Sequence, residues 1–277
     1  MGDFEKDTAV AGGDGQYTAT AIGDWRIWGP MGGYVAAIAL RAAAAEVADG
    51  LSPASFTCQF LAPARFEPVD IAVTVRRASR RAALVAANIT QDGVAILDSQ
   101  TWFAVDADVV EHDHAKPHRF GHPDDHRDIS ELTNEEPRFP FWYNFDAKPV
   151  DWIPPEEFEQ YQGGEPEWAE WVRFKPRATF DDPVVEACRT LLLADLPSFP
   201  AATRAHAFGT VNWMSPSLDL AVQFHRVADI GDWLLSIGTA PIAHRGLLGF
   251  RSEVWNAAGL LVASGSGQLL CRSAPPQ

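Results

Sequence analysis

The stretch SFTCQFLA at residues 55–62 recurs as DLAVQFHR at residues 219–226, 164 positions further along the chain. A second pair of similar stretches, SRRAALVAANITQDG at 79–93 and RGLLGFRSEVWNAAG at 245–259, has nearly the same separation. Each copy also has a helix-forming segment upstream of its strand patterns. Repeated units of this kind pack as a pseudo-symmetric pair, with a groove where they meet. The sequence therefore predicts two similar halves.

The first copy combines one helix pattern with four strand patterns. The Ala-rich segment at residues 34–48 favours a helix, and Gly50 is placed to end it. Because this helix has almost no polar face, we expect it to be buried. One buried helix along a run of antiparallel strands is an α+β plan. The strand patterns, the last two joined by an Asp-Gly turn, lie at residues 55–61, 69–78, 82–91 and 94–105.

The second copy repeats this plan from residue 140 onward. Two acids and then Pro183 predict the start of a helix, because acids suit the positive end of the helix dipole and proline lacks an amide that would be unpaired there. This helix is expected to end near Asp195. The sequence thus divides into a first unit at residues 1–105, a linker at 106–139 and a second unit at 140–277. Strand patterns of the second unit lie at residues 170–176, 218–225, 233–240, 247–255 and 260–271.

The net charge of −15 is concentrated around the linker, where residues 106–182 carry 20 acidic and 8 basic side chains. We interpret this segment as solvated and solubilising. Nucleic acid is excluded as a partner because no basic face is visible. Four linker histidines have helical spacing, but Pro117 and Pro123 would break such a helix. We expect a linker there with no metal, and no cofactor elsewhere.

The three cysteines are an odd number at unrelated spacings, which favours a reducing compartment over a disulfide framework or a zinc ribbon. The first 15 residues lack the basic, apolar and small-residue order of a secretory signal. No apolar run of 18 residues exists to span a bilayer. We therefore expect a cytoplasmic protein without a membrane partner.

Three polar residues of the second half are candidates for catalysis. Asp195 ends the apolar run LLLAD, where a carboxylate is unusual unless it is paired or reactive. In a half-buried site its pKa would rise, and it could act as a general base toward water. The alternative is a helix-end acid turned to solvent. Ser217 could equally cap a turn before its strand, and Gln268 could be an ordinary exposed strand residue.

Further candidates would bind rather than react. Gly32 and Gly33 open the first helix, where free N–H groups could receive a ligand carbonyl oxygen or the oxyanion formed when that carbonyl is attacked. A tight turn would need the same glycines. His225 lies in an apolar strand, and we interpret it as a structural residue and not a catalytic one. The only compact basic cluster could hold an anionic ligand tail or could simply be solvated strand ends. It consists of Arg76, Arg77, Arg80 and Arg81.

Several other chemistries lack their motifs. The SGSGQ stretch at residues 264–268 is only a loose echo of the G-x-S-x-G nucleophile elbow. No G-x-G-x-x-G follows a strand, and neither a Walker loop nor an H-E-x-x-H motif is present. Cys188 lies in an apolar helix and is interpreted as core.

Taken together, these pieces resemble acyl-CoA thioesterase II-like proteins. WGPMGGYVAAIALRAA at 28–43, PASFTCQFLAP at 53–63 and VRRASRRAALVAANITQDG at 75–93 resemble the first half of that family. LLLAD at 191–195, SLDLAVQFHR at 217–226 and AAGLLVASGSGQLL at 257–270 are similar to the second half. The order and spacing of the pieces also match.

The resemblance implies a double hotdog, with two antiparallel sheets each wrapped around a long central helix. It also implies hydrolysis of acyl-CoA thioesters to free acid and CoA, and a place in fatty acid metabolism. The family's trio of acid, hydroxyl and amide corresponds to Asp195, Ser217 and Gln268, which would activate a water without a covalent intermediate. Gly33 would supply a backbone N–H, and acyl-CoA would be the partner. Trp213 and Trp255 could line an acyl pocket.

Two departures from the family bear on the trio. Ser217 replaces a common Thr, which keeps the hydroxyl but loses the methyl that restricts its rotamer. Gln268 comes four residues after Val-Ala-Ser instead of three, which turns it to the opposite face unless a bulge at Gly265 or Gly267 restores it. The alternative function is a non-catalytic hotdog that binds an acyl ligand. A hotdog hydratase lacks a convincing Asp–His pair, and self-association through an edge strand stays open.

Overall fold

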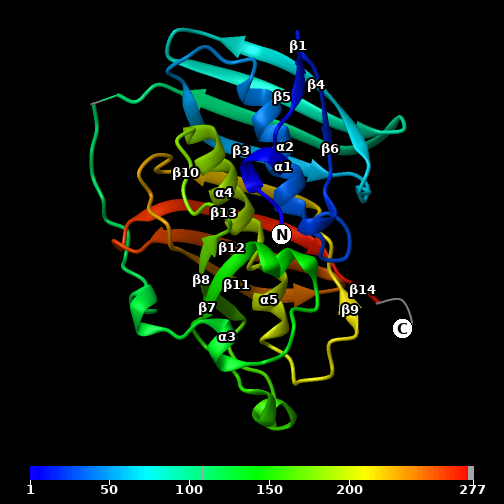
Figure 1. Ribbon diagram of the computed structural model, residues 1–277, viewed down its shortest axis with the longest axis vertical. Helices are drawn as coiled ribbons and strands as arrows, with labels where there is room; N and C mark the ends of the chain where they lie inside the picture. The colour runs from blue at the N-terminus through cyan, green and yellow to red at the C-terminus, as the bar shows by residue number, and fades with distance from the viewer. Residues whose placement is uncertain (108, 274–277) are drawn as a thin grey trace.

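A computed structural model describes residues 1–107 and 109–273 and has two similar halves, each with one long helix (Figure 1). In the first half, α2 spans Gly32–Ala44, close to the predicted helix. The strands also agree closely with the prediction, and the structure adds a short helix α1 (Phe4–Asp7). The strands of this half are β1 (Ala11–Gly13), β2 (Gln16–Thr20), β3 (Ser52–Phe60), β4 (Pro68–Ala78), β5 (Ala82–Gln91) and β6 (Val94–Ala104).

The second half repeats the arrangement around α4 (Pro183–Asp195). The Asp182 side chain accepts a hydrogen bond from the N–H of Val184 (2.8 Å), so the acidic start of this helix acts as its cap. Further helices are α3 (Ile129–Leu132) and α5 (Ser198–Thr203). The strands are β7 (Phe145–Pro149), β8 (Glu167–Phe174), β9 (Trp213–Met214), β10 (Asp219–Phe224), β11 (Leu234–His244), β12 (Leu247–Asn256), β13 (Leu261–Leu270) and β14 (Arg272–Ser273).

Twelve strands from the two halves form one large sheet, which corrects the expectation of two separate sheets, and β9 and β14 pair with each other apart from it. Its twelve strands run in the order β1-β2-β4-β5-β6-β3-β10-β13-β12-β11-β8-β7. The halves join because β3 pairs antiparallel with β10, where Thr57 lies opposite Ala221. These two strands contain most of the repeated stretches at residues 55–62 and 219–226. A pseudo-two-fold axis therefore passes beside this pair, and it relates each residue of β3 to the residue of β10 that lies 164 positions later.

The helices α2 and α4 pack against each other under this sheet (Figure 1). The Cys188 thiol donates a weak hydrogen bond to the carbonyl of Ala37 (3.4 Å), so the interpretation of Cys188 as core agrees with its position. A Cβ on Gly33 would lie 2.8 Å from the Cα of Leu192, which requires glycine at this crossing. Close contact between the helices brings the first turn of α2 to the last turn of α4.

The linker packs on the second half instead of being wholly solvated. After β6 the chain runs along one side of the molecule to reach the second half (Figure 1). Phe120 is buried there with Trp171 and Trp255 on the sheet. The His118 ring lies 5.8 Å from the Trp171 ring and 5.4 Å from the Trp255 ring, so that one linker histidine contributes to packing. Trp255 thus belongs to this cluster, away from the helix side of the sheet.

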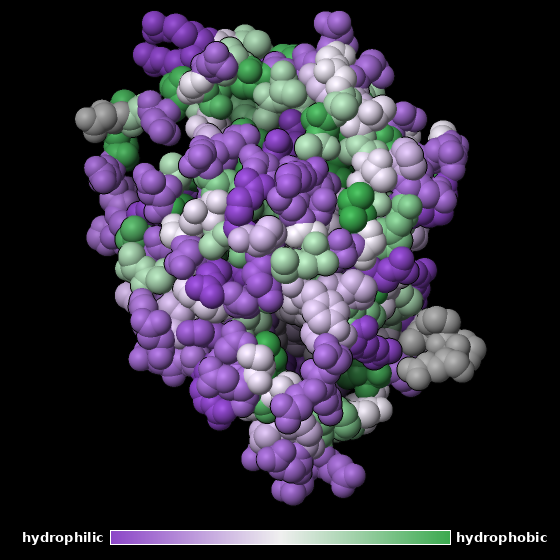
Figure 2. Space-filling model, viewed as in Figure 1, coloured by the Kyte–Doolittle hydropathy of each residue, from purple (hydrophilic) through white to green (hydrophobic). Residues whose placement is uncertain are grey.

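The face in Figure 2 is mostly hydrophilic, with scattered apolar groups.

The buried carboxyl group of Glu170 on β8 has no counterion among the described residues. The side chain is buried, and its Oε2 has no hydrogen-bond partner among the described residues. Burial, with a smaller contribution from the charge of Asp128, raises the pKa of Glu170 to about 8. The group is therefore largely neutral in the folded protein at pH 7.

Glu170→Gln is expected to stabilise the protein increasingly as the pH rises from 5 to 8. Between pH 4.5 and about 8 the unfolded chain releases this proton and the folded protein keeps it. Each pH unit in that window therefore costs the native protein about 1.4 kcal/mol, which the glutamine variant does not lose. Urea unfolding of both proteins at pH 5 and pH 8 measures the difference. If the two proteins differ in free energy of unfolding by the same amount at pH 5 and at pH 8, the raised pKa of Glu170 is contradicted.

Candidate active site

Asp195, at the last position of α4, is fixed through both carboxylate oxygens. The Gly33 N–H donates to Oδ2 (2.8 Å), and the Ser217 hydroxyl donates to Oδ1 (3.3 Å). The Ser198 hydroxyl donates to the Asp195 carbonyl (2.8 Å) and so helps to satisfy the helix end. The structure therefore brings together Asp195, Ser217 and Gly33 from both halves.

Burial dominates the electrostatics of this carboxyl. Asp195 is 5 % exposed, which is inconsistent with the alternative of a helix-end acid turned to solvent. Desolvation raises the pKa of Asp195 to about 6, and the hydrogen bonds from Gly33 and Ser217 oppose the shift. At pH 7 the carboxylate form dominates but remains a competent proton acceptor.

The glycine pair at the start of α2 allows this contact. A Cβ on Gly32 would lie 2.8 Å from Asp195 Oδ2, and one on Gly33 would lie 3.2 Å from the Asp195 Cβ. Glycine is therefore needed at both positions because the backbone lies close to the Asp195 carboxylate. A tight turn is not the reason for these glycines. The Gly33 N–H is directed at Asp195, whereas the sequence analysis expected it to face substrate.

The structure does not bring the Gln268 side chain to this site. The ladder between β12 and β13 is regular from residue 263 to 270, so the predicted bulge at Gly265 or Gly267 does not occur there. Gly265 faces the α4 side, because a Cβ on it would lie 3.4 Å from that of Ala194. By alternation Gly267 shares that side and Gln268 points to the opposite face.

Gly267 stands at the family's usual spacing for the amide, three residues after Val-Ala-Ser. A Cβ there would lie 2.4 Å from the Asp219 carbonyl oxygen and 2.7 Å from the Phe250 ring. The position that would direct a glutamine toward the helix is therefore filled by Phe250. Gln268 contributes its backbone instead, because its N–H donates to Asp219 Oδ1 (3.1 Å).

The first-half arginines lie at the other end of the sheet from Asp195. A Cβ on Gly32 would lie 3.3 Å from the Phe60 ring, and the strand pairs that start at Phe60 lead across the sheet to Ile71 on β4. The hairpin with Arg80 and Arg81 begins eight residues beyond Ile71. At the usual rise of a strand this separation is about 25 Å. The predicted cluster is therefore not brought to the carboxylate.

Two arginines that the sequence analysis missed lie on the Asp195 side. Ser217 forms a bridge with Leu269, which pairs with Leu248 near the β11–β12 hairpin. Arg245 is in that hairpin, and Arg272 pairs with Met214 in the small β9–β14 sheet. The sequence repeat could have identified Arg245, because it aligns this residue with the arginine hairpin of the first half.

A chain of aromatic rings lies beside the same three segments. The Trp28 ring is 4.9 Å from Phe199, and Phe199 is 5.3 Å from Trp213. Trp28 lies four residues before Gly32, and Phe199 lies four residues after Asp195. Trp213 lies four residues before Ser217. Trp28 is 44 % exposed. The three rings therefore form a continuous aromatic wall beside the segments that contain Gly32, Asp195 and Ser217.

The described residues contain no group of three or more His, Cys, Asp or Glu side chains that could hold a metal ion. Within the same ranges, no helix has the length and apolarity needed to cross a membrane. His225 lies away from Asp195, and its Nε2 is 3.0 Å from the Ser264 hydroxyl. Burial lowers the pKa of His225.

Solved structures share this architecture along almost the whole chain, which defines a hotdog-fold protein. An acyl-CoA thioesterase II, TesB2, from Mycobacterium marinum is 21% identical, with a TM-score of 0.79 and coverage of 98% of this chain and 99% of that chain. A conserved hot dog-fold protein of unknown function from Alicyclobacillus acidocaldarius is 20% identical, with a TM-score of 0.82 and coverage of 99% and 98%. The tesB protein of Mycobacterium avium subspecies paratuberculosis is 21% identical, with a TM-score of 0.74 and coverage of 99% and 98%.

Family matches extend this class assignment to a particular family. The acyl-CoA thioesterase N-terminal domain matches residues 21–104, and the acyl-CoA thioesterase C-terminal domain matches residues 122–270. The chain therefore belongs to the acyl-CoA thioesterase family, whose members are enzymes that act on thioesters of coenzyme A.

Proposed function

We propose that this protein hydrolyses acyl-CoA thioesters with a water that Asp195 activates and Ser217 helps to position. One observation carries the proposal: a buried carboxyl with a pKa of about 6 lies where the two halves meet, with both oxygens fixed. The division into a first unit at 1–105, a linker at 106–139 and a second unit at 140–277 is part of the same proposal.

The reaction needs no covalent intermediate. The Asp195 carboxylate takes a proton from water as the hydroxide oxygen bonds to the thioester carbonyl carbon. The tetrahedral intermediate collapses when the carbon–sulfur bond breaks, and the protonated Asp195 returns its proton to the leaving thiolate. Free acid and CoA result, and the carboxylate is restored. The start of α2 at Gly32 is the proposed place for the carbonyl oxygen, because a helix N-terminus favours negative charge and the Gly33 N–H already donates to Asp195.

The remaining parts of the substrate have separate contacts in this proposal. The aromatic wall of Trp28, Phe199 and Trp213 receives the acyl group, because these rings offer apolar surface beside the carboxylate. Arg245 and Arg272 are exposed on the same side and are available for the phosphates of CoA.

Ser217→Ala is expected to lower kcat for an acyl-CoA about tenfold, because Asp195 loses a hydrogen bond to its charged form. Ser217→Thr keeps the hydroxyl and is the matched control, which should retain most of the activity. Steady-state kinetics of the three proteins provides the comparison. Equal losses in both variants would show that the hydroxyl does not matter.

A second candidate function is acyl-CoA binding without turnover. The observation that favours it is the orientation of Gln268, which leaves the water with two polar side chains instead of three. Thiol release from a panel of CoA thioesters with short, medium, long and aromatic acyl groups distinguishes the two functions. Hydrolysis of any member above the uncatalysed rate supports the enzyme, and binding of the whole panel without thiol release would overturn it.

A further inference from the structure

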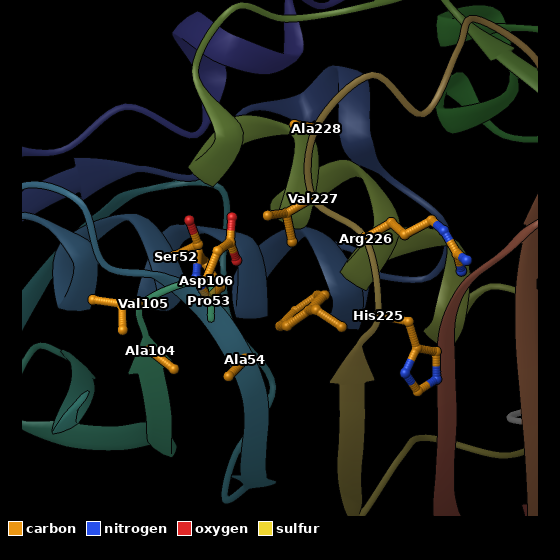
Figure 3. A pocket seen from close by; sticks show the side chains of 11 residues that line it. Ser52, Pro53, Ala54, Ala104, Val105, Asp106, His225, Arg226, Val227 and Ala228 are labelled. Carbon is orange, nitrogen blue, oxygen red and sulfur yellow. The ribbon is translucent and has the colours of Figure 1, made fainter. Parts of the chain in front are cut away.

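A cavity of about 330 Å³ lies at the opposite end of the β3–β10 junction from Asp195. Its walls come from the start of β3, the end of β6 and the segment that follows β10, at residues 52–54, 104–106 and 224–228 (Figure 3). In Figure 3, Ser52 and Asp106 lie on one wall and Val227 and His225 on the other. The cavity shares none of its lining residues with the proposed hydrolytic site.

The pseudo-two-fold axis relates this cavity to the Asp195 site. The shift of 164 positions takes Ser217 back to Pro53, which lines the cavity, and takes Phe60 forward to Phe224, which lines it as well. The helices follow the same symmetry, because α2 and α4 both contain 13 residues. The cavity is therefore the symmetry counterpart of the Asp195 site in the other half of the repeat.

The counterpart lacks the helix-end acid, and α2 has an arginine one turn before the corresponding position. Matching the two helices end to end places Ala44 at the position of Asp195 and Arg41 at that of Leu192. The Arg41 Nη1 atom is buried and has no hydrogen-bond partner among the described residues. The nearby Glu46 carboxylate accepts from the Gly15 N–H (2.8 Å) and the Tyr17 hydroxyl (2.6 Å), so it is directed away from this end.

The basic hairpin between β4 and β5 adjoins the same cavity. The Arg81 carbonyl accepts a hydrogen bond from the N–H of Val105 (3.0 Å), a residue of the cavity wall. The hairpin arginines are exposed and form no ion pair with another described residue. Arg226, by contrast, is paired with Asp113. The unpaired hairpin set is Arg76, Arg77, Arg80 and Arg81.

We propose that this cavity is a second site, without hydrolytic activity, for the phosphorylated adenosine end of coenzyme A. The hairpin guanidiniums pair with the phosphates, which suits their planar donor geometry. The cavity is at the small end of the range for ligand pockets, so it holds the nucleotide portion and not the whole cofactor. No carboxylate faces the site from the helix pair, so a bound thioester would not be cleaved there. The choice of CoA as the ligand rests on the proposed function. The cavity and the unpaired arginines are observed independently of that function.

Equilibrium dialysis of labelled CoA against full-length Asp195→Asn protein tests the proposal, because this variant removes turnover from the measurement. Two CoA molecules per chain are expected. Arg80→Ala/Arg81→Ala should weaken one of the two sites at least tenfold, whereas Arg245→Ala should leave that site unchanged and weaken the other. Arg251→Ala, an exposed arginine on β12, is the control for loss of one positive charge. Thermal unfolding checks that each variant is folded.

Different outcomes test the second site, the identity of its ligand and the proposed hydrolytic function separately. Asp106→Asn removes the acid of the cavity wall and should strengthen the second site severalfold. A single CoA per chain, or a hairpin variant that binds like its parent, would overturn the second site. Competition by ATP or inorganic phosphate as strong as that by CoA would overturn the assignment to CoA. A native protein that binds two CoA molecules but hydrolyses no thioester would contradict the proposed function and leave this inference standing.

Discussion

Asp195→Asn is expected to lower kcat for acyl-CoA hydrolysis at least about a hundredfold, as expected for the loss of a general base. Asparagine has nearly the same shape and can still accept the Gly33 N–H through its side-chain oxygen. It cannot accept a proton from water at neutral pH. The variant therefore removes the proposed chemistry with little change in packing.

The pH profile provides a second test of the same residue. The pKa of Asp195 is raised to about 6, so kcat/KM of the native protein should fall below pH 6 as the carboxylate becomes protonated. Any residual activity of Asp195→Asn should lack this step. Asp98→Asn, which changes an exposed acid hydrogen-bonded to Asn88, is the matched control and should behave like the native protein. A native profile that is flat across pH 5–7 would remove Asp195 from the mechanism.

Stability measurements separate lost chemistry from lost fold. Because the pKa of Asp195 is raised from 3.8, the folded state holds its proton more tightly than the unfolded chain does. The resulting stabilisation is complete below pH 3.8 and is lost as the pH rises through about 6. At pH 7 the native protein therefore carries a buried charge that the asparagine variant lacks. Asp195→Asn should be at least as stable as the native protein at pH 7.

The helices and strands were predictable because their apolar patterns are local. The apolar segment of α2 and the acidic start of α4 gave both long helices, and strict alternation gave the central strands. Asp195 was found for the same reason, since a carboxylate at the end of LLLAD conflicts with its apolar neighbours. The contact between Gly33 and Asp195 shows that the two halves meet at this carboxylate.

The rest depended on spatial relations that one sequence does not contain. Antiparallel pairing of β3 with β10 uses backbone groups, so no side-chain pattern distinguishes one continuous sheet from two. The face of Gln268 depended on whether β13 bulges at its glycines, which are compatible with either register. The register shift in this strand lies earlier, between residues 261 and 263. The end of the sheet at which an arginine hairpin lies became clear only with the strand order. Phe120 shows that an acidic linker can still contain a buried anchor.

Arg189→Met is expected to lower the free energy of unfolding by about 3–5 kcal/mol, because it leaves a buried carboxylate without its partner. Arg189 is fully buried in α4 and pairs with the equally buried Glu186. Its guanidinium also donates to the carbonyl oxygens of Ala178 and Gly231 (2.8 Å for the latter). Burial lowers the pKa of Arg189 and raises that of Glu186, so both charges depend on each other.

Urea unfolding of Arg189→Met and of the double variant Glu186→Gln/Arg189→Met measures this dependence. The double variant removes the stranded charge, so it should recover part of the lost stability. Glu186 also accepts the Phe180 N–H (2.6 Å), and this contact fixes the segment that leads into α4. Because Asp195 ends the same helix, Arg189→Met should also lower kcat/KM at temperatures where the variant remains folded. A loss of stability below about 1 kcal/mol would mean that water reaches the stranded carboxylate and that this pair does not hold the helix in place.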